Sequence, residues 1–143
     1  MASRREEVIL AMEALVTQAL SWSTVKRDAP WPTRPEPGGT VIIRDGDPGE
    51  PEVTLGVLSY TYTHDIPLEV FGATGASSRH ELLDDMLTAL GKAIEADRTL
   101  GGLVEWLEPS AAAPDDITVE NGQPIRAAIL TVTAIYSTTS PLG

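Results

Sequence analysis

The sequence predicts an α+β fold in which two helices pack on one face of a mostly antiparallel sheet. Two segments, 3–22 and 78–98, carry apolar residues at helical spacing. The segments between and after them show the alternation of a half-buried strand. Helices do not alternate with single strands, which disfavours a parallel βαβ arrangement. The length of 143 residues and the lack of an internal repeat predict one compact domain over 1–143.

Both helices begin with the spacing of a capping box. Ser3 and Glu6 have it, and Ser78 and Glu81 repeat it, so that a hydroxyl caps the first turn while the glutamate returns to the cap amide. The apolar stripe of the first helix consists of Val8, Ile9, Met12, Leu15, Val16, Ala19 and Leu20. The stripe of the second consists of Leu83, Met86, Leu87, Leu90 and Ile94. We expect both stripes to face the core.

Short strands are expected at 23–29, 40–44 and 53–58, with two extended loops between them. The loop over 29–39 contains four prolines and two glycines, and alternate prolines cannot join a central sheet. The loop over 45–52 is acidic and rich in turn-forming residues. Both loops are long for a small domain, and long loops often carry function.

The clearest strand pattern covers 60–70, where Tyr60, Tyr62, His64, Ile66, Leu68 and Val70 share one side. Pro67 lacks a donor midway, which indicates an edge strand or a change of partner at a bulge. The last strand, 126–138, places Ala128, Leu130, Val132, Ala134 and Tyr136 on one face, with Ile129 and Ile135 on a partly covered second face.

Shorter strands are expected between the second helix and the last strand. They cover 103–109 and 117–120, with a loop at 110–116 between them. Asn121 and Gly122 form a hairpin signal, because both residues tolerate the positive φ of a type I′ turn. The chain is therefore predicted to reach its last strand through antiparallel neighbours.

The stretch DRTLGGLVEW (97–106) joins the second helix to these strands through Gly101 and Gly102. A phosphate site needs amides at the start of a helix, whereas these glycines follow one. We therefore predict a helix stop with Gly101 at C′ and with Gly102 giving a second turn. Close backbone contact with a partner is the alternative.

Composition excludes several function classes. The chain has a net charge of −11 and only ten lysines and arginines, which disfavours binding to nucleic acid through its phosphates. The absence of cysteine excludes disulfides, thiolate nucleophiles and Cys-based metal sites. No apolar run is long enough to span a membrane, and we expect a soluble intracellular protein. The acidic balance fits either solubility or a surface that meets DNA without holding it.

No cluster of side chains indicates catalysis, a metal or a cofactor. His64 and His80 have no ligand spacing, and Asp84 is an i,i+4 neighbour of His80 on a helix surface. The acids of 45–52 lack the glycine and flanking helices of an EF-hand. We therefore expect no catalytic residue, no metal ligand and no cofactor.

The joint DRTLGGLVEWLEP and the strand AILTVTAIYST resemble those of the tail terminator (tail completion) proteins of long-tailed bacteriophages and prophages. The amphipathic first helix, VKRD and the Pro-rich loop before TVIIRDG fit the same family. The resemblance covers nearly the whole chain in the order of its elements. It carries no catalytic motif with it.

The resemblance implies a virion structural protein. Six copies would form a ring on the head-proximal end of the tail tube and stop the growth of the tube. The other side of the ring would meet neck or head-completion proteins, and also sheath proteins in a contractile tail. DNA would pass through the lumen without specific binding, and no membrane is involved. Assembly would take place in the host cytoplasm.

Within this interpretation the two loops supply the contacts. Asp45, Asp47, Glu50 and Glu52 are candidates for the lumen or rim, and Trp31 and Arg34 are candidate interface anchors. Two rival functions stay open. One is another neck protein, for head closure or head–tail joining. The other is a small enzyme or ligand-binding domain, which predicts a pocket and a monomer or dimer.

Overall fold

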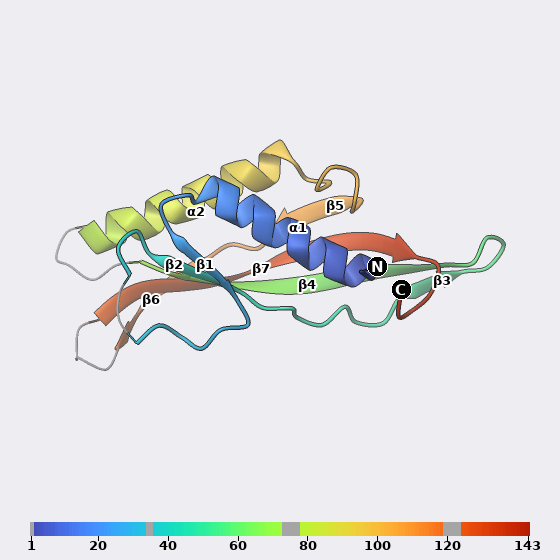
Figure 1. Cartoon of the computed structure of the whole chain (residues 1–143), viewed down its shortest axis with the longest axis horizontal. Helices are drawn as coiled ribbons and strands as arrows, with labels where there is room; N and C mark the ends of the chain where they lie inside the picture. Colours follow the sequence, from blue (N-terminus) through green and yellow to red (C-terminus); the bar gives the residue numbers. More distant parts are fainter. Residues whose placement is uncertain (1, 34–35, 73–77, 119–123) are drawn as a thin grey trace.

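The computed structural model describes residues 2–33, 36–72, 78–118 and 124–143, and it confirms the predicted α+β class. Two helices lie on one face of a mostly antiparallel seven-stranded sheet in a single compact domain (Figure 1). The helices are α1 (Arg4–Ala19) and α2 (Ser78–Ala96). The strands are β1 (Thr24–Arg27), β2 (Thr40–Ile43), β3 (Glu52–Thr54), β4 (Ser59–Phe71), β5 (Trp106–Pro109), β6 (Ala113–Thr118) and β7 (Pro124–Thr138).

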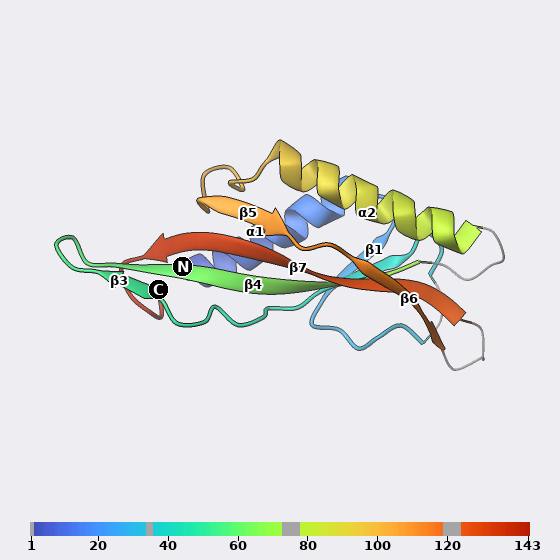
Figure 2. The ribbon, with the colours of Figure 1, turned by 180° about the vertical axis from the view of Figure 1, so that it is seen from behind.

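The two longest strands form the centre of the sheet. The main path runs β1-β2-β4-β7-β5, while β3 pairs with β4 and β6 pairs with β7. The register of β4 and β7 runs without a break from Tyr60↔Thr138 to Phe71↔Ala127. Only the pair β1–β2 is parallel among the described strands. Figure 2 shows β5 and β6 following one another along the same edge of β7.

The core lies between the helices and one face of β4 and β7. The predicted stripes supply Val8, Ile9, Met12 and Val16 from α1 and Leu83, Met86, Leu90 and Ile94 from α2. The alternating strand residues face them, and Ile66, Leu68, Val132 and Ala134 are fully buried. Burial of each large aliphatic side chain contributes roughly 1.5–3 kcal/mol, so this layer supplies most of the driving force for folding.

The cap of α1 is only half of the predicted box. The Ser3 hydroxyl accepts a hydrogen bond from the Glu6 amide at 3.2 Å. The Glu6 carboxylate does not return to the cap; it accepts two hydrogen bonds from the Arg27 guanidinium. The charge-assisted pair with arginine is the stronger interaction for an exposed carboxylate, which explains the difference.

Of the two alternatives predicted at Pro67, the edge strand is wrong, because β4 lies between β2 and β7. The change of partner is confirmed, because on one side β4 pairs with β2 after Pro67 and with Asp47 and β3 before it. The Pro67 carbonyl accepts from the Arg44 amide at 3.0 Å, one residue past the end of β2 at Ile43. The nitrogen and the carbonyl of a strand residue point to the same side. The missing N–H of Pro67 therefore falls where the β2 ladder has already ended, and it interrupts no pairing.

The joint after α2 is longer than predicted. The helix ends at Ala96, so Gly101 is not its C′ residue. Leu100, Gly101 and Gly102 all have positive φ (49°, 69° and 94°), and they form a separate turn into β5. The Asp97 carboxylate accepts from the Gly101 amide at 3.0 Å and stabilises this turn. The glycines therefore form the turn that leads into β5, and they do not end the helix.

Three short segments also differ from prediction. Residues 53–58 are not one strand, because β3 ends at Thr54 and the chain turns back into β4 at Ser59. The expected loop at 110–116 and strand at 117–120 are replaced by a strand beginning at Ala113, which pairs with β7. Strand β5 begins at Trp106 instead of residue 103. The Asn121–Gly122 turn lies outside the described residues.

The two ends of the described chain lie side by side, close to the β3–β4 hairpin (Figure 1). The Arg4 amide, in the first turn of α1, donates a hydrogen bond to the Gly143 carbonyl at 3.2 Å. This contact ties the start of the helical layer to the segment that follows β7.

Candidate interaction site

The β3–β4 hairpin forms the most apolar exposed surface of the described chain. Thr54 pairs with Ser59 and closes a turn over 55–58, in which Gly56 has a φ of 119°. The side chains of this region are uncovered: Val53 is 51%, Leu55 79%, Val57 84% and Leu58 46% exposed. Figures 1 and 2 both show the hairpin extending beyond the helices at one end of the molecule. We call residues 53–58 the hairpin tip.

Sequence reasoning missed the hairpin tip as a candidate site because it predicted a short strand over 53–58. The signal was present in the sequence. It is an uncharged apolar run interrupted by Gly56, a residue that often marks a turn. Monomeric proteins rarely expose such a cluster, and an exposed apolar cluster often marks a protein–protein contact.

Asp45, the first candidate acid, is paired with another residue of the same subunit. Its carboxylate accepts from Arg27 Nε at 2.7 Å and Nη2 at 2.9 Å, while Glu6 accepts from the same guanidinium at 2.6 and 2.8 Å. Hydrogen bonding to Arg27 holds the pKa of both carboxyl groups below their ordinary values. Arg27 therefore links α1, β1 and the acidic loop, and Asp45 shares the single positive charge of Arg27 with Glu6.

His64 lies beneath this loop and is fully buried. Its Nε2 is 2.6 Å from the Asp45 carbonyl oxygen and its Nδ1 is 2.9 Å from the Tyr136 hydroxyl. Since a carbonyl only accepts, Nε2 carries the proton and Nδ1 accepts from the hydroxyl. Burial lowers the pKa of His64 and raises the pKa of Tyr136 to about 12. Both groups are neutral and structural in this arrangement.

The other three acids of the loop are exposed. Asp47, Glu50 and Glu52 have open side chains along the segment that leads into β3. The Asp47 carboxylate accepts from the Gly49 amide at 2.9 Å, and Asp47 forms an isolated bridge with Asp65 of β4. The backbone of the loop is thus attached to the sheet, while its carboxylates face solvent and are free to meet a lumen or a partner.

Trp31 lies on the face of the sheet opposite the helices. It is 49% exposed, packs edge-on against Phe71 at 5.7 Å between ring centroids, and donates from Nε1 to Glu69 at 3.1 Å. Beside it is a hollow of about 280 Å³ that Ile117 and Ile129 help to line. Trp31 therefore anchors the Pro-rich loop while about half of its surface stays exposed. Arg34, the other predicted anchor, lies outside the described residues.

No family model and no curated protein matches this chain.

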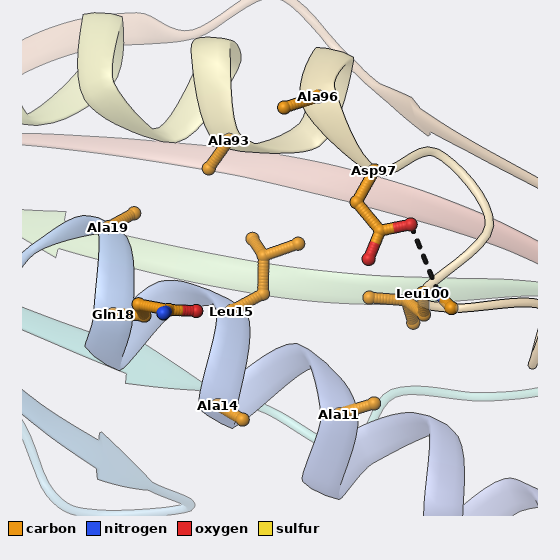
Figure 3. Close-up of a pocket in the computed structure, with 10 residues that line it drawn as sticks. Ala11, Ala14, Leu15, Gln18, Ala19, Ala93, Ala96, Asp97 and Leu100 are labelled. Atoms are coloured by element: carbon orange, nitrogen blue, oxygen red, sulfur yellow. Dashed lines mark hydrogen bonds between the residues drawn. The ribbon is translucent and has the colours of Figure 1, made fainter.

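The helical side of the molecule contains a groove of about 450 Å³ between α1 and α2. Figure 3 shows Leu15 of α1 pointing toward α2, with Ala93 and Ala96 on the opposite wall. Most of its lining residues are small, namely Ala11, Ala14, Ala19, Ala93, Ala96 and Gly101. The helices leave a groove because alanine does not fill the space between them.

The described residues offer little for chemistry. None of their His, Asp and Glu side chains form a group of three placed to hold a metal ion. No helix in this part of the chain is long and apolar enough to cross a bilayer. The predicted candidates do not converge on one pocket: the acids lie along the loop to β3, and Trp31 lies on the open sheet face.

Proposed function

We propose that this protein is a tail terminator: a structural subunit that forms a hexameric ring on the head-proximal end of a phage tail tube. In this function the ring ends tube polymerisation and joins the tail to the neck, with DNA passing through its lumen. The observation that carries the proposal is the hairpin tip. Four large apolar side chains exposed on a projecting hairpin are what an assembling subunit needs and a solitary one avoids.

The charge of the chain supports the same proposal. A net charge of −11 keeps a lumen from binding DNA, which must slide through it. Asp47, Glu50 and Glu52 are the side chains proposed for the lumen or rim, since they are exposed on a loop attached to the sheet. Asp45 is removed from that set because Arg27 already pairs with it.

The proposal is tested by mass in solution, from light scattering on a sizing column, with negative-stain images of the same peak mixed with purified tail tubes. We expect a hexamer, or a monomer that forms rings only on tube ends. A monomer or dimer that ignores tube ends would contradict the proposal. Binding to a head-side protein without binding to tubes would instead favour a head-closure or head–tail joining protein.

The lumen assignment has its own test. The triple variant Asp47→Lys, Glu50→Lys and Glu52→Lys reverses the charge of the exposed loop without touching the Arg27 contacts. We expect rings of normal mass whose particles deliver DNA poorly, because a basic lumen retains phosphate backbones. Normal ring mass, tail length and DNA delivery together would remove these residues from the lumen.

A further inference from the structure

The hairpin tip is uncharged as well as apolar and exposed. Residues 53–63 contain no Asp, Glu, Lys or Arg, in a chain in which 22% of residues are charged. Two copies of a chain with a net charge of −11 repel each other over most of their surfaces. Contact between copies costs least where charge is absent, and the hairpin tip meets this condition.

The groove between α1 and α2 has the matching character. Only Asp97 among its lining residues is charged, and the carboxylate of Asp97 accepts from the Gly101 amide. Leu15 and Leu100 are partly buried and add apolar surface to the alanine walls (Figure 3). Its volume of about 450 Å³ falls within the usual range of binding pockets, roughly 300–1,000 Å³. The groove therefore accepts aliphatic side chains without burying an unpaired charge.

The hairpin tip does not reach the groove of its own subunit. Figures 1 and 2 show the hairpin extending away from the helices at the end of the molecule where the chain termini lie. The groove lies between the C-terminal parts of both helices, lined by residues 11–19 and 93–101. An aliphatic segment that fills the groove must come from another molecule, and a second copy of this chain supplies one of suitable chemistry.

We infer that the hairpin tip of one copy docks in the α1–α2 groove of the next copy. Leu55 and Val57, the two most exposed side chains of the tip, enter between the alanine walls. The two surfaces differ, so the contact is heterologous, and repetition of a heterologous contact closes a ring when the rotation per subunit allows it. The inference rests on the proposed function for ring closure, but the docking contact itself is tested separately.

The absence of cysteine from the chain provides a direct test. Val57→Cys and Ala96→Cys are made in separate full-length chains, mixed, and oxidised mildly. We expect a disulfide-linked pair of the two variants, identified by mass spectrometry of the joined peptides. Ile129→Cys is the matched control, because Ile129 is 53% exposed on the opposite face of the sheet. It should not join to Val57→Cys.

A charge-swap series tests the same contact without a covalent bond. Val57→Lys and Ala96→Glu each place a charge in a desolvated contact, and each should abolish assembly by light scattering. The double variant pairs the two charges and should restore assembly. Both positions are exposed, so circular dichroism and the melting temperature should match the parent chain.

The outcomes separate the docking contact from the function. Joining of Val57→Cys to Ile129→Cys, in place of Ala96→Cys, would overturn the groove as the docking site. Full-mass rings formed by Val57→Lys would overturn the docking contact and leave the terminator function standing. A Val57–Ala96 disulfide in a protein that ignores tube ends would keep the docking contact and remove the terminator function. A chain that forms neither the disulfide nor rings, in solution or on tube ends, would contradict both.

Discussion

The helix-covered face of the sheet and the hairpin tip place the same kinds of side chain in opposite environments. Ile66 and Leu68 of β4 are fully buried beneath the helices, whereas Leu55 and Val57 of the tip are about four-fifths exposed. Both sets lie on or beside the same strand, β4. The first set makes the subunit stable and leaves nothing for a partner. The second adds little to stability, because its side chains are largely uncovered in the subunit.

The largest effect is expected in the covered layer. Ile66→Ala removes buried methyl groups from the centre of the core and should lower the free energy of unfolding by about 2–5 kcal/mol, measured by urea denaturation. Ile66→Val is the matched control and should cost about 0.5–1.5 kcal/mol. Equal, small losses in both variants would mean that this face is not the main source of stability.

A smaller effect is expected at the polar position of the same face. Tyr136→Phe removes the hydroxyl that donates to His64 Nδ1 and leaves a buried acceptor without its donor. We expect a loss of about 1–3 kcal/mol in urea denaturation. Tyr60→Phe is the control, because Tyr60 is partly buried and its hydroxyl makes no hydrogen bond within the described residues. Matching losses would contradict the assigned pair.

The same histidine predicts a pH dependence. The pKa of His64 is lowered by burial from its ordinary value of 6.5, so the unfolded chain binds a proton first as the pH falls. Stability should therefore be constant above pH 6.5 and decline below it, before the lowered pKa values of Glu6 and Asp45 take effect near pH 4. Urea unfolding across this range measures it. A His64→Gln variant should lose this decline, and its persistence there would assign the effect elsewhere.

The smallest effect on stability is expected at the tip. Leu55→Ser and Val57→Ser together should change the free energy of unfolding by only about 0.5 kcal/mol, because neither side chain is buried in the subunit. Assembly, followed by light scattering, should be lost. A large loss of stability would show that the tip packs against its own subunit. It would contradict the contrast between the covered face and the hairpin tip.

The strands and helices with strong periodicity were predictable, because burial on one side repeats in the sequence. The stripes of α1 and α2 and the alternation along β4 and β7 are all confirmed. The choice between an edge strand and a change of partner at Pro67 stayed open, because it depends on where the neighbouring strand β2 ends, which no local pattern records. The end of α2 at Ala96 was missed because Gly101 was the stronger local signal.

The candidate site was less predictable for a related reason. The Arg27–Asp45 contact depends on the parallel pairing of β1 and β2, which brings together residues 18 positions apart. The acidic loop was predicted as a surface feature. The sequence could not distinguish Asp45, which pairs with Arg27, from the exposed acids of the same loop. The tip was missed because alternation predicts which side of a strand is apolar, and only the sheet shows whether anything covers it.

The Arg4 amide and the Gly143 carbonyl are joined by a hydrogen bond, so residues 4 and 143 lie close enough to be linked. The order of the elements along the chain could then be changed without changing the fold. A short linker across this contact, with new termini opened at Gly56, would give a circular permutant that retains every strand pairing. In such a permutant β3 and β4 would no longer be joined through a turn. The tip would become two loose chain ends within an otherwise unchanged domain.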